Sequence, residues 1–206
     1  MNAVSTDTRQ RILESARDLI YASSYAEVGV AAICERASVK KGSFYHFFPS
    51  KQELTLAVID EFLVEFKERM FAQAFSPDIA PLDRFRKLLE IGYGFQVEMA
   101  AVLGHIPGCP FGNLAAELST QDDGIRSKVD QVFALMERQF AATLHEAIGR
   151  GDVPPEVDAD ATARAMLAFL EGVLLMAKTR NDARVMLELG PAVADLRILK
   201  SSALST

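Results

Sequence analysis

Apolar residues recur at helical spacing along almost the whole of this chain. In the first segment the apolar side chains at positions 12, 13, 16, 19 and 20 fall on one side of a helix, because successive residues turn by about 100° around a helix axis. Strict alternation of apolar and polar residues, which is the pattern of a half-buried strand, is nearly absent. The sequence therefore predicts an all-α fold.

Capping residues and helix breakers divide this pattern into separate helices. Ser5 or Thr6 is expected to cap the first helix, and Ser50 with Glu53 forms the S-x-x-E pattern of a capping box. The helices that follow the first one are expected at residues 30–37, 41–47, 50–74, 83–103, 111–119, 122–149, 159–178 and 183–200.

The composition excludes several classes of protein. The chain has 206 residues, half of them hydrophobic and 24% charged, which is the balance of a globular protein. No apolar run approaches the ~20 residues of a membrane-spanning helix, and the first seven residues lack the parts of a secretion signal. Two cysteines, Cys34 and Cys109, make neither a disulfide framework nor a zinc quartet. We therefore expect a cytoplasmic protein without a membrane partner.

The charge is unevenly spread along the chain. The formal net charge is −6, yet residues 1–51 carry seven basic and five acidic side chains, a net of +2, which leaves −8 for the remainder. An acidic protein does not coat nucleic acid non-specifically, whereas a basic segment can contact phosphates locally. The sequence thus indicates a mildly basic head on an acidic body.

Two short helices, predicted at residues 30–37 and 41–47, follow each other across a tight turn at residues 38–40. Two short helices joined in this way form a helix-turn-helix motif. Phe44, Phe47 and Phe48 are spaced to anchor the second helix to a core. Its polar side chains are left pointing outward, namely Lys41, Ser43, Tyr45 and His46. Such side chains can bond phosphate oxygens and base edges, and Lys51, in the first turn of the next helix, adds a predicted phosphate contact.

Residues 9–54, and above all the motif Lys-Gly-x-Φ-Tyr-x-x-Phe-x-x-Lys-x-x-Leu at residues 41–54, resemble the DNA-binding domain of TetR-family transcriptional regulators. The resemblance implies a three-helix DNA-binding domain at residues 1–52 and a helical ligand-binding and dimerisation domain at residues 53–206. It implies double-stranded operator DNA, a second copy of the chain and a small-molecule inducer as partners. We therefore expect a regulator, and more specifically a repressor, that leaves a palindromic operator when the inducer binds.

The motif also assigns roles to single residues. Carried over by position, DNA-contact roles fall on Lys41, Tyr45, His46 and Lys51, and Gly42 lets the helix approach DNA closely.

The sequence departs from the family pattern in three places. Val28 and Gly29 stand where the family usually has Ser or Thr, so a hydroxyl that caps the helix and touches phosphate is lost. Lys40 replaces a frequent Ser and is expected to supply a phosphate contact in its place. Ser38 replaces a turn glycine, which costs about 1 kcal/mol if the turn needs a positive φ.

The predicted helix over 159–178 is apolar on two opposite sides. One side carries Ala165, Ala168, Phe169, Gly172 and Met176. A helix that is apolar on two sides is buried on two sides, so one side is expected to meet a partner chain. The final helix adds Leu196 and Leu199, and two copies would form a four-helix bundle, which agrees with the dimer that the resemblance implies. The alternative is a central helix enclosed by its own chain.

Regulators of this family typically enclose a ligand among their central helices, where this chain has many large apolar residues. Small-molecule pockets are mostly apolar with few polar groups. The residues assigned to a ligand pocket on this basis are Phe66, Tyr93, Phe95, Met99, His105, Cys109, Phe111, Asn113, Met136, Phe140 and Phe169. Tyr93, His105 and Asn113 are the expected polar contacts.

The sequence gives little support to catalysis. The three histidines lack metal-ligand spacing, and neither an H-E-x-x-H motif, a G-x-S-x-G motif nor a phosphate-binding glycine loop occurs. We therefore expect no catalytic residue, metal or cofactor. An all-α enzyme acting on an apolar substrate is the rival class of function.

Cys109 indicates a second kind of regulator, one that senses oxidants or electrophiles. Pro110 is suited to the first position of a helix, which makes Cys109 the expected N-cap of the helix over 111–119. Free N–H groups at a helix start favour a reactive thiolate. The alternative is a cap without reactivity, and Cys34, expected to be buried, is the inert comparison.

Overall fold

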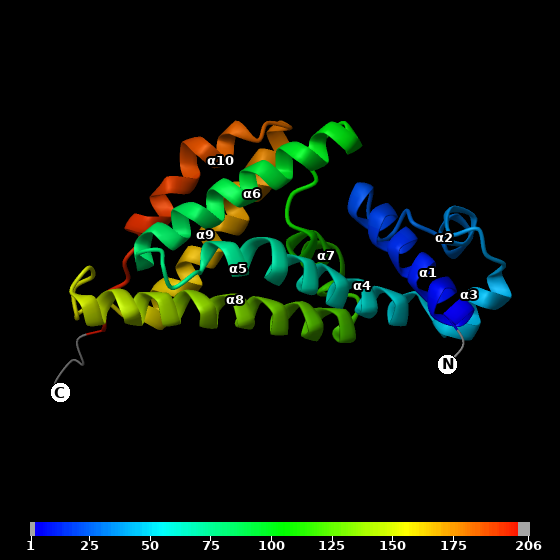
Figure 1. Ribbon diagram of the computed structural model, residues 1–206, viewed down its shortest axis with the longest axis horizontal. Helices are drawn as coiled ribbons and strands as arrows, with labels where there is room; N and C mark the ends of the chain where they lie inside the picture. Colours follow the sequence, from blue (N-terminus) through cyan, green and yellow to red (C-terminus); the bar gives the residue numbers. More distant parts are fainter. Residues whose placement is uncertain (1–2, 202–206) are drawn as a thin grey trace. The chain divides into compact units, whose positions relative to one another are not determined.

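The computed structural model describes residues 3–201, with side chains from Asp7 onward, and it is helical almost throughout (Figure 1). The all-α prediction is confirmed. The helices fall into two compact units, which are described separately: within the described residues, unit 1 takes 3–66 and 110–130, and unit 2 takes 67–109 and 131–201. In this part of the chain, no helix combines the length and the apolar composition needed to cross a membrane.

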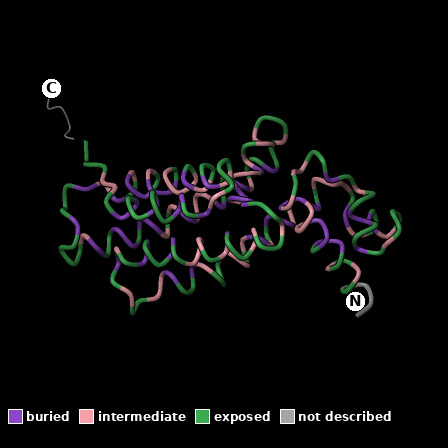
Figure 2. Tube along the Cα trace, turned by 90° about the horizontal axis from the view of Figure 1, so that it is seen from above, coloured by how far each residue is buried: buried purple, intermediate pink, exposed green. Residues whose placement is uncertain are grey.

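Unit 1 contains the helices of the predicted helix-turn-helix. They are α1 (Ala3–Ala22), α2 (Val30–Arg36), α3 (Lys41–Phe47) and α4 (Lys51–Phe66), together with α7 (Pro110–Leu118) and the first turns of α8 (Asp123–Arg150). α1 packs against α2, α3 and α4. Fully buried side chains fill the space between them, among them Ile12, Ile33, Phe44, Leu54 and Ile59. Along each helix buried residues alternate with exposed ones, as Figure 2 shows, which is the expected result of helical apolar spacing.

The turn between α2 and α3 does need a positive φ, the condition under which Ser38 carries the cost expected from the sequence. Ser38 has a φ of 54°, in the left-handed region that favours glycine. Its N–H donates to the Glu35 carbonyl at 3.0 Å. Gly29 is the N-cap of α2 and supplies no side-chain cap, so the loss of the capping hydroxyl is also confirmed.

The two predicted helix starts have different outcomes. α1 begins at Ala3, so Ser5 and Thr6 lie inside the helix and the predicted cap is wrong. At the start of α4 the Ser50 hydroxyl accepts the Glu53 N–H at 3.0 Å, as a capping box requires.

The helix predicted over 50–74 contains a π-helical stretch. α4 ends at Phe66, Lys67–Phe71 form the π-helix η1, and α5 (Ala72–Ala74) follows. A π-helical turn holds one residue more than an α-helical turn and often occurs at functional positions. Here it begins at the border between the two units.

Unit 2 is built around α6 (Pro81–Leu103), most of α8, α9 (Ala159–Arg180) and α10 (Arg184–Leu189). α10 packs against both α6 and α9, and Figure 1 shows these three helices side by side. An aromatic cluster joins α6 and α8, with ring centroids 5.0 to 6.4 Å apart, and consists of Phe71, Phe75, Phe85 and Phe140. The buried Arg84 guanidinium binds both carboxylate oxygens of Glu146, at 2.5 and 3.0 Å, so its charge is paired.

The helix predicted over 183–200 is much shorter in the structure. α10 ends at Leu189, and the 3-10 helix η2 (Gly190–Asp195) follows before the chain becomes extended. Gly190 and Pro191 account for the break, because glycine is a poor helix former and proline supplies no N–H.

Beyond η2 the chain runs beside the start of α9. The Asp158 N–H donates to the Ile198 carbonyl, and the Lys200 N–H donates to the Glu156 carbonyl, both at 2.8 Å. Leu196 and Leu199 therefore do not lie on a helix, and the helical face that assigned them to a dimer bundle is wrong.

Candidate DNA-binding site

Buried aromatic residues anchor helix α3, and its polar side chains lie on the outer side. Phe44 is fully buried and Phe48 is 3% exposed, whereas Phe47 is half-buried. The predicted DNA contacts of this region lie at the surface: Lys40, Lys41, Gly42, Tyr45 and His46 are exposed, and Ser43 is partly exposed. The helix thus offers donors and acceptors of the kinds that bind phosphates and base edges.

Ring contacts orient two of these side chains. The Tyr45 ring meets Phe44 edge-on with centroids 5.1 Å apart, and the His46 ring meets Phe47 edge-on at 4.9 Å. Edge-to-face pairs of this kind are favourable. Both rings are therefore held against α3 while their residues stay exposed.

Gly42 lies on the exposed side of α3, where the chain itself does not need a glycine. A Cβ added there would meet no heavy atom of the described chain within 4 Å, apart from the neighbouring residues and the backbone of α3 itself. Glycine nevertheless costs a helix interior about 1 kcal/mol relative to alanine. Internal packing does not account for this residue, and the close approach of DNA that the motif implies stays a prediction.

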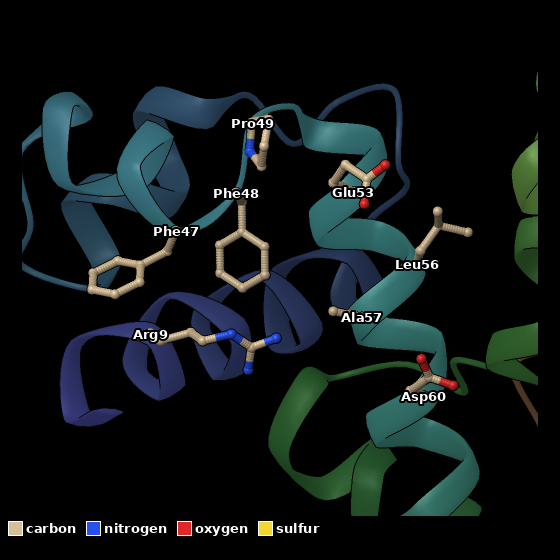
Figure 3. A pocket seen from close by; sticks show the side chains of 8 residues that line it. All are labelled: Arg9, Phe47, Phe48, Pro49, Glu53, Leu56, Ala57 and Asp60. Atoms are coloured by element: carbon tan, nitrogen blue, oxygen red, sulfur yellow. The ribbon is translucent and has the colours of Figure 1, made fainter. Parts of the chain in front are cut away.

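An open hollow of about 270 Å³ lies beside α3 (Figure 3). Its lining comes from α1, α4, the last residue of α3 and the two residues that follow it, and consists of Arg9, Phe47, Phe48, Pro49, Glu53, Leu56, Ala57 and Asp60. The Arg9 guanidinium lies over the Phe48 ring, 5.0 Å from its centroid, in a cation–π contact. Because the carboxylates of Glu53 and Asp60 also line the hollow, its charge is mixed, and it does not extend a phosphate-binding surface.

Lys51 is the predicted contact whose position differs from expectation. Its ammonium donates to the Tyr25 carbonyl and lies over the Tyr25 ring, 3.7 Å from the centroid. Burial lowers the pKa of Lys51, and the nearby Glu117 carboxylate acts in the opposite direction. The side chain is thus engaged inside unit 1, and a phosphate contact requires it to leave Tyr25. The sequence did not point to Tyr25, because the two residues are 26 positions apart.

The residues assigned to a ligand pocket belong to both units. In unit 2, Met136 and Phe140 are buried core residues, Phe95 lies 5.3 Å from the Arg69 guanidinium, Met99 is half-buried and His105 is exposed. Tyr93 and Phe169 pack against one buried cluster, which consists of Ile106, Val173, Ala177, Ala183, Val185 and Met186.

Phe66, Phe111 and Asn113 belong to unit 1. The buried Phe111 ring meets Phe66 edge-on, with centroids 6.2 Å apart, and Asn113 is half-buried. Their ligand-binding roles, like those of the residues in unit 2, stay predictions. Among the described residues no group of three or more His, Cys, Asp or Glu side chains is placed to hold a metal ion.

Cys109 lies directly before α7, at the position predicted for its N-cap. Its half-buried thiol donates a hydrogen bond to the Glu171 carboxylate of α9, and burial raises the pKa of Glu171. Glu171 is a partner that the sequence did not indicate, since it lies on α9, 62 positions after Cys109.

Side chains also fix the residues just before Cys109. The Gly108 N–H donates to the Gln96 Oε1 atom at 3.0 Å, and the Gly108 carbonyl accepts from Gln96 Nε2 at 3.1 Å. The Ile106 N–H donates to Asn181 Oδ1 at 2.8 Å. The segment 106–109 is therefore held by α6 and by both the middle and the end of α9.

The side of α9 that was predicted to meet a partner is uncovered in the single chain. Ala168, Gly172 and Met176 are exposed, and Ala165 and Phe169 are half-buried. On the opposite side Ala163, Leu167 and Ala177 are buried. Leu175 was not predicted, yet it is 63% exposed and extends the same apolar side.

The fold and the exposed face of α3 define a helix-turn-helix DNA-binding protein with a second helical unit. Comparison with known families makes the class specific. Residues 12–58 match the family "Bacterial regulatory proteins, tetR family", and residues 81–190, more than half of the chain, match "Tetracyclin repressor-like, C-terminal domain". The chain belongs to the TetR family, and it is a ligand-responsive transcriptional regulator that binds DNA.

Individual relatives agree with this assignment. The transcriptional regulator AcuR of Cereibacter sphaeroides is 33% identical over 82% of this chain and 75% of its own. The HTH-type transcriptional repressor DhaR of a Mycobacterium species is 25% identical over 86% of this chain and 85% of its own. The crystal structure of a regulatory protein TetR from Rhodobacter sphaeroides is 28% identical and covers 92% of this chain and 98% of that one, with a TM-score of 0.81.

Gly42→Ala is expected to weaken DNA binding while it stabilises the protein. The added methyl group would stand between α3 and the DNA, and we expect affinity to fall by about tenfold, equivalent to about 1.4 kcal/mol. The helix gains up to about 1 kcal/mol from alanine. Fluorescence anisotropy on a duplex selected from a random library by the parent protein measures the first effect, and thermal denaturation measures the second.

Gly149→Ala is the matched control, because Gly149 is also an exposed helical glycine with open space around it. It should show the stabilisation alone. Unchanged DNA affinity in Gly42→Ala would mean that DNA does not approach α3 at this point.

Proposed function

We propose that two copies of this chain bind a palindromic operator and repress transcription until a small molecule enters unit 2. The observation that carries the proposal is the exposed polar side of α3 above the buried Phe44. In each copy α3 would enter a major groove, with the two half-sites about 34–36 Å apart along the DNA. The name of the relative DhaR, a transcriptional repressor, supports repression as the default action.

Release from DNA would follow from a shift between two conformations. A ligand that prefers a dimer whose heads no longer fit successive grooves weakens DNA binding by the ratio of its two affinities. The apolar surroundings of Tyr93 and Phe169 favour a mainly apolar ligand, with the Tyr93 hydroxyl as a polar contact.

Lys41→Ala and Tyr45→Ala test the assigned DNA surface. Both side chains are exposed, so the variants should fold like the parent and bind the selected duplex at least about tenfold more weakly, as expected for loss of about 1–3 kcal/mol. Lys41→Ala should also reduce the slope of log affinity against log salt by about 1.8, because each of the two protomers loses one phosphate contact that contributes about 0.9.

Lys67→Ala is the matched control for charge, because Lys67 is exposed on η1 and outside the helix-turn-helix. It should bind like the parent. If Lys41→Ala and Tyr45→Ala also bind like the parent in a salt-matched titration, the assigned surface is wrong.

The uncovered side of α9 supports a dimer formed through this helix. Gly172→Trp should yield monomers, because the indole would hold two copies of α9 apart, and a monomer has only half of the DNA contacts. Analytical ultracentrifugation at micromolar concentration measures the change. Gly94→Trp, at an exposed glycine of α6 with open space around it, should remain dimeric, and a monomeric parent protein would refute the proposal.

Electrophile sensing by Cys109 is a second candidate function, and its hydrogen bond to Glu171 favours it. Burial raises the pKa of Glu171, which makes this carboxylate a better proton acceptor than an exposed one. With N-ethylmaleimide, the thiol proton would pass to Glu171, sulfur would form a bond to one alkene carbon, and the other alkene carbon would take up a proton.

The sensing hypothesis predicts that N-ethylmaleimide modifies Cys109 before Cys34 and releases the protein from DNA. Cys34 should react slowly, because it is 5% exposed and burial raises its pKa. Cys109→Ala should still bind DNA but ignore the reagent, and Glu171→Gln should slow the modification, as followed by mass spectrometry. Equal release of the parent and of Cys109→Ala would leave Cys109 as a helix cap only.

A further inference from the structure

The carboxylate of Glu117, near the end of α7, binds the backbone of the loop between α1 and α2. Its two carboxylate oxygens each accept one N–H, from Tyr25 at 3.0 Å and from Ala26 at 2.7 Å. Hydrogen bonds to a charged acceptor are stronger than those between neutral groups. The end of α7 is therefore firmly tied to this loop.

The same loop holds Lys51 on its other side. The Tyr25 N–H points to Glu117, while the Tyr25 carbonyl and ring both bind the Lys51 ammonium. The Glu117 carboxylate also attracts this ammonium through space, since it raises the pKa of Lys51 against the effect of burial. Glu117, Tyr25 and Lys51 thus form one connected group, which we call the Lys51 latch.

A second contact ties the next residue of α4 to the start of α8. Gln52 Nε2 donates to the Asp122 carboxylate at 2.8 Å, and Asp122 also accepts the Ile125 N–H at 2.9 Å. The bonds from Ile125 and Gln52 lower the pKa of Asp122, so it stays ionised. The first turn of α4 is therefore linked twice to the region where α7 ends and α8 begins. Gln52 contacts this region directly, and Lys51 is linked to it through the loop between α1 and α2.

We propose that Glu117 is a positioning residue for DNA binding, which keeps the Lys51 ammonium on Tyr25 and away from the DNA phosphates. The inference rests on the proposed function, because the family motif supplies the role of Lys51 as a phosphate contact. While the latch is closed, Lys51 neutralises no phosphate. When Glu117 loses its charge or moves, Lys51 leaves Tyr25 and adds one phosphate contact in each protomer.

The latch and a purely structural tie predict opposite effects. If Glu117 only braces the loop, its loss leaves the DNA-binding helices less ordered and weakens binding. If Glu117 keeps Lys51 from DNA, its loss strengthens binding, and the gain requires the Lys51 ammonium. The dependence of affinity on salt distinguishes the two, because it reports how many phosphates the protein neutralises.

A double-mutant cycle between Glu117 and Lys51 makes the measurement. Glu117→Gln removes the charge and keeps one acceptor oxygen, whereas Lys51→Met removes the ammonium and keeps most of the side-chain stem. The parent, both single variants and the double variant are titrated with the duplex selected by the parent, from about 50 to 200 mM salt.

The latch predicts that Glu117→Gln binds about tenfold more tightly at the lower salt concentration. Its plot of log affinity against log salt should steepen by about 1.8, because two regained phosphate contacts contribute about 0.9 each. Lys51→Met alone should change the slope little, and the double variant should return to the slope of the parent.

Glu27→Gln is the matched control, because Glu27 is an exposed carboxylate of the same loop. It changes the net charge equally, so any gain in affinity should be the same with and without Lys51→Met. Tyr25→Leu provides a second route to an open latch. It removes the ring under Lys51, leaves Glu117 in place, and should steepen the slope in the same direction, which keeps the test valid if Glu117→Gln fails to fold.

Three outcomes would overturn the latch proposal. The first is an unchanged slope of log affinity against log salt in both Glu117→Gln and Tyr25→Leu, and the second is a steeper slope that persists after Lys51→Met. The third is weaker DNA binding by a folded Glu117→Gln protein. None of them affects the assignment of α3 to DNA. That assignment fails separately, if Lys41→Ala and Tyr45→Ala bind like the parent.

Discussion

The proposed DNA-binding surface depends on the burial of Phe44. α3 has only seven residues, fewer than the ~12–15 that an isolated helix needs to be stable in water. It therefore forms only because its apolar side is packed, with Phe44 fully buried and Phe48 nearly so. Since Lys41 and Tyr45 lie on the other side of the same helix, the packing that creates α3 also turns its polar groups outward.

Local sequence patterns predicted the helices whose ends lie at breakers, because caps and turns act over a few residues. α2, α3, α8 and α9 begin or end within about two residues of their predicted bounds, and Ser38 has the positive φ that its turn required. The helix predicted over 183–200 is wrong because Gly190 and Pro191 end α10 locally, and beyond this break the Lys200 N–H pairs with the distant Glu156 carbonyl. No local periodicity encodes such a pair.

The candidate site shows the same division between near and distant partners. The predicted contacts on α3 could be named from the sequence because they are neighbours in one short motif. The inward contact of Lys51 could not, since Tyr25 lies 26 residues before it and Glu117 lies 92 residues after Tyr25. A motif identifies the side chains suited to DNA, but the competing internal partners depend on the tertiary fold.

Helix α9 connects the features found in unit 2. Asn181 at its C-terminal end accepts the Ile106 N–H, and Glu171 in its middle accepts the Cys109 thiol proton in a hydrogen bond, so α9 holds both ends of segment 106–109. Gly172, beside Glu171 in sequence, lies on the proposed dimer face. Because packed helices shift as rigid elements, a displacement of α9 would move the groups that hold this segment together with the proposed dimer face. The segment continues directly into α7, which carries Glu117.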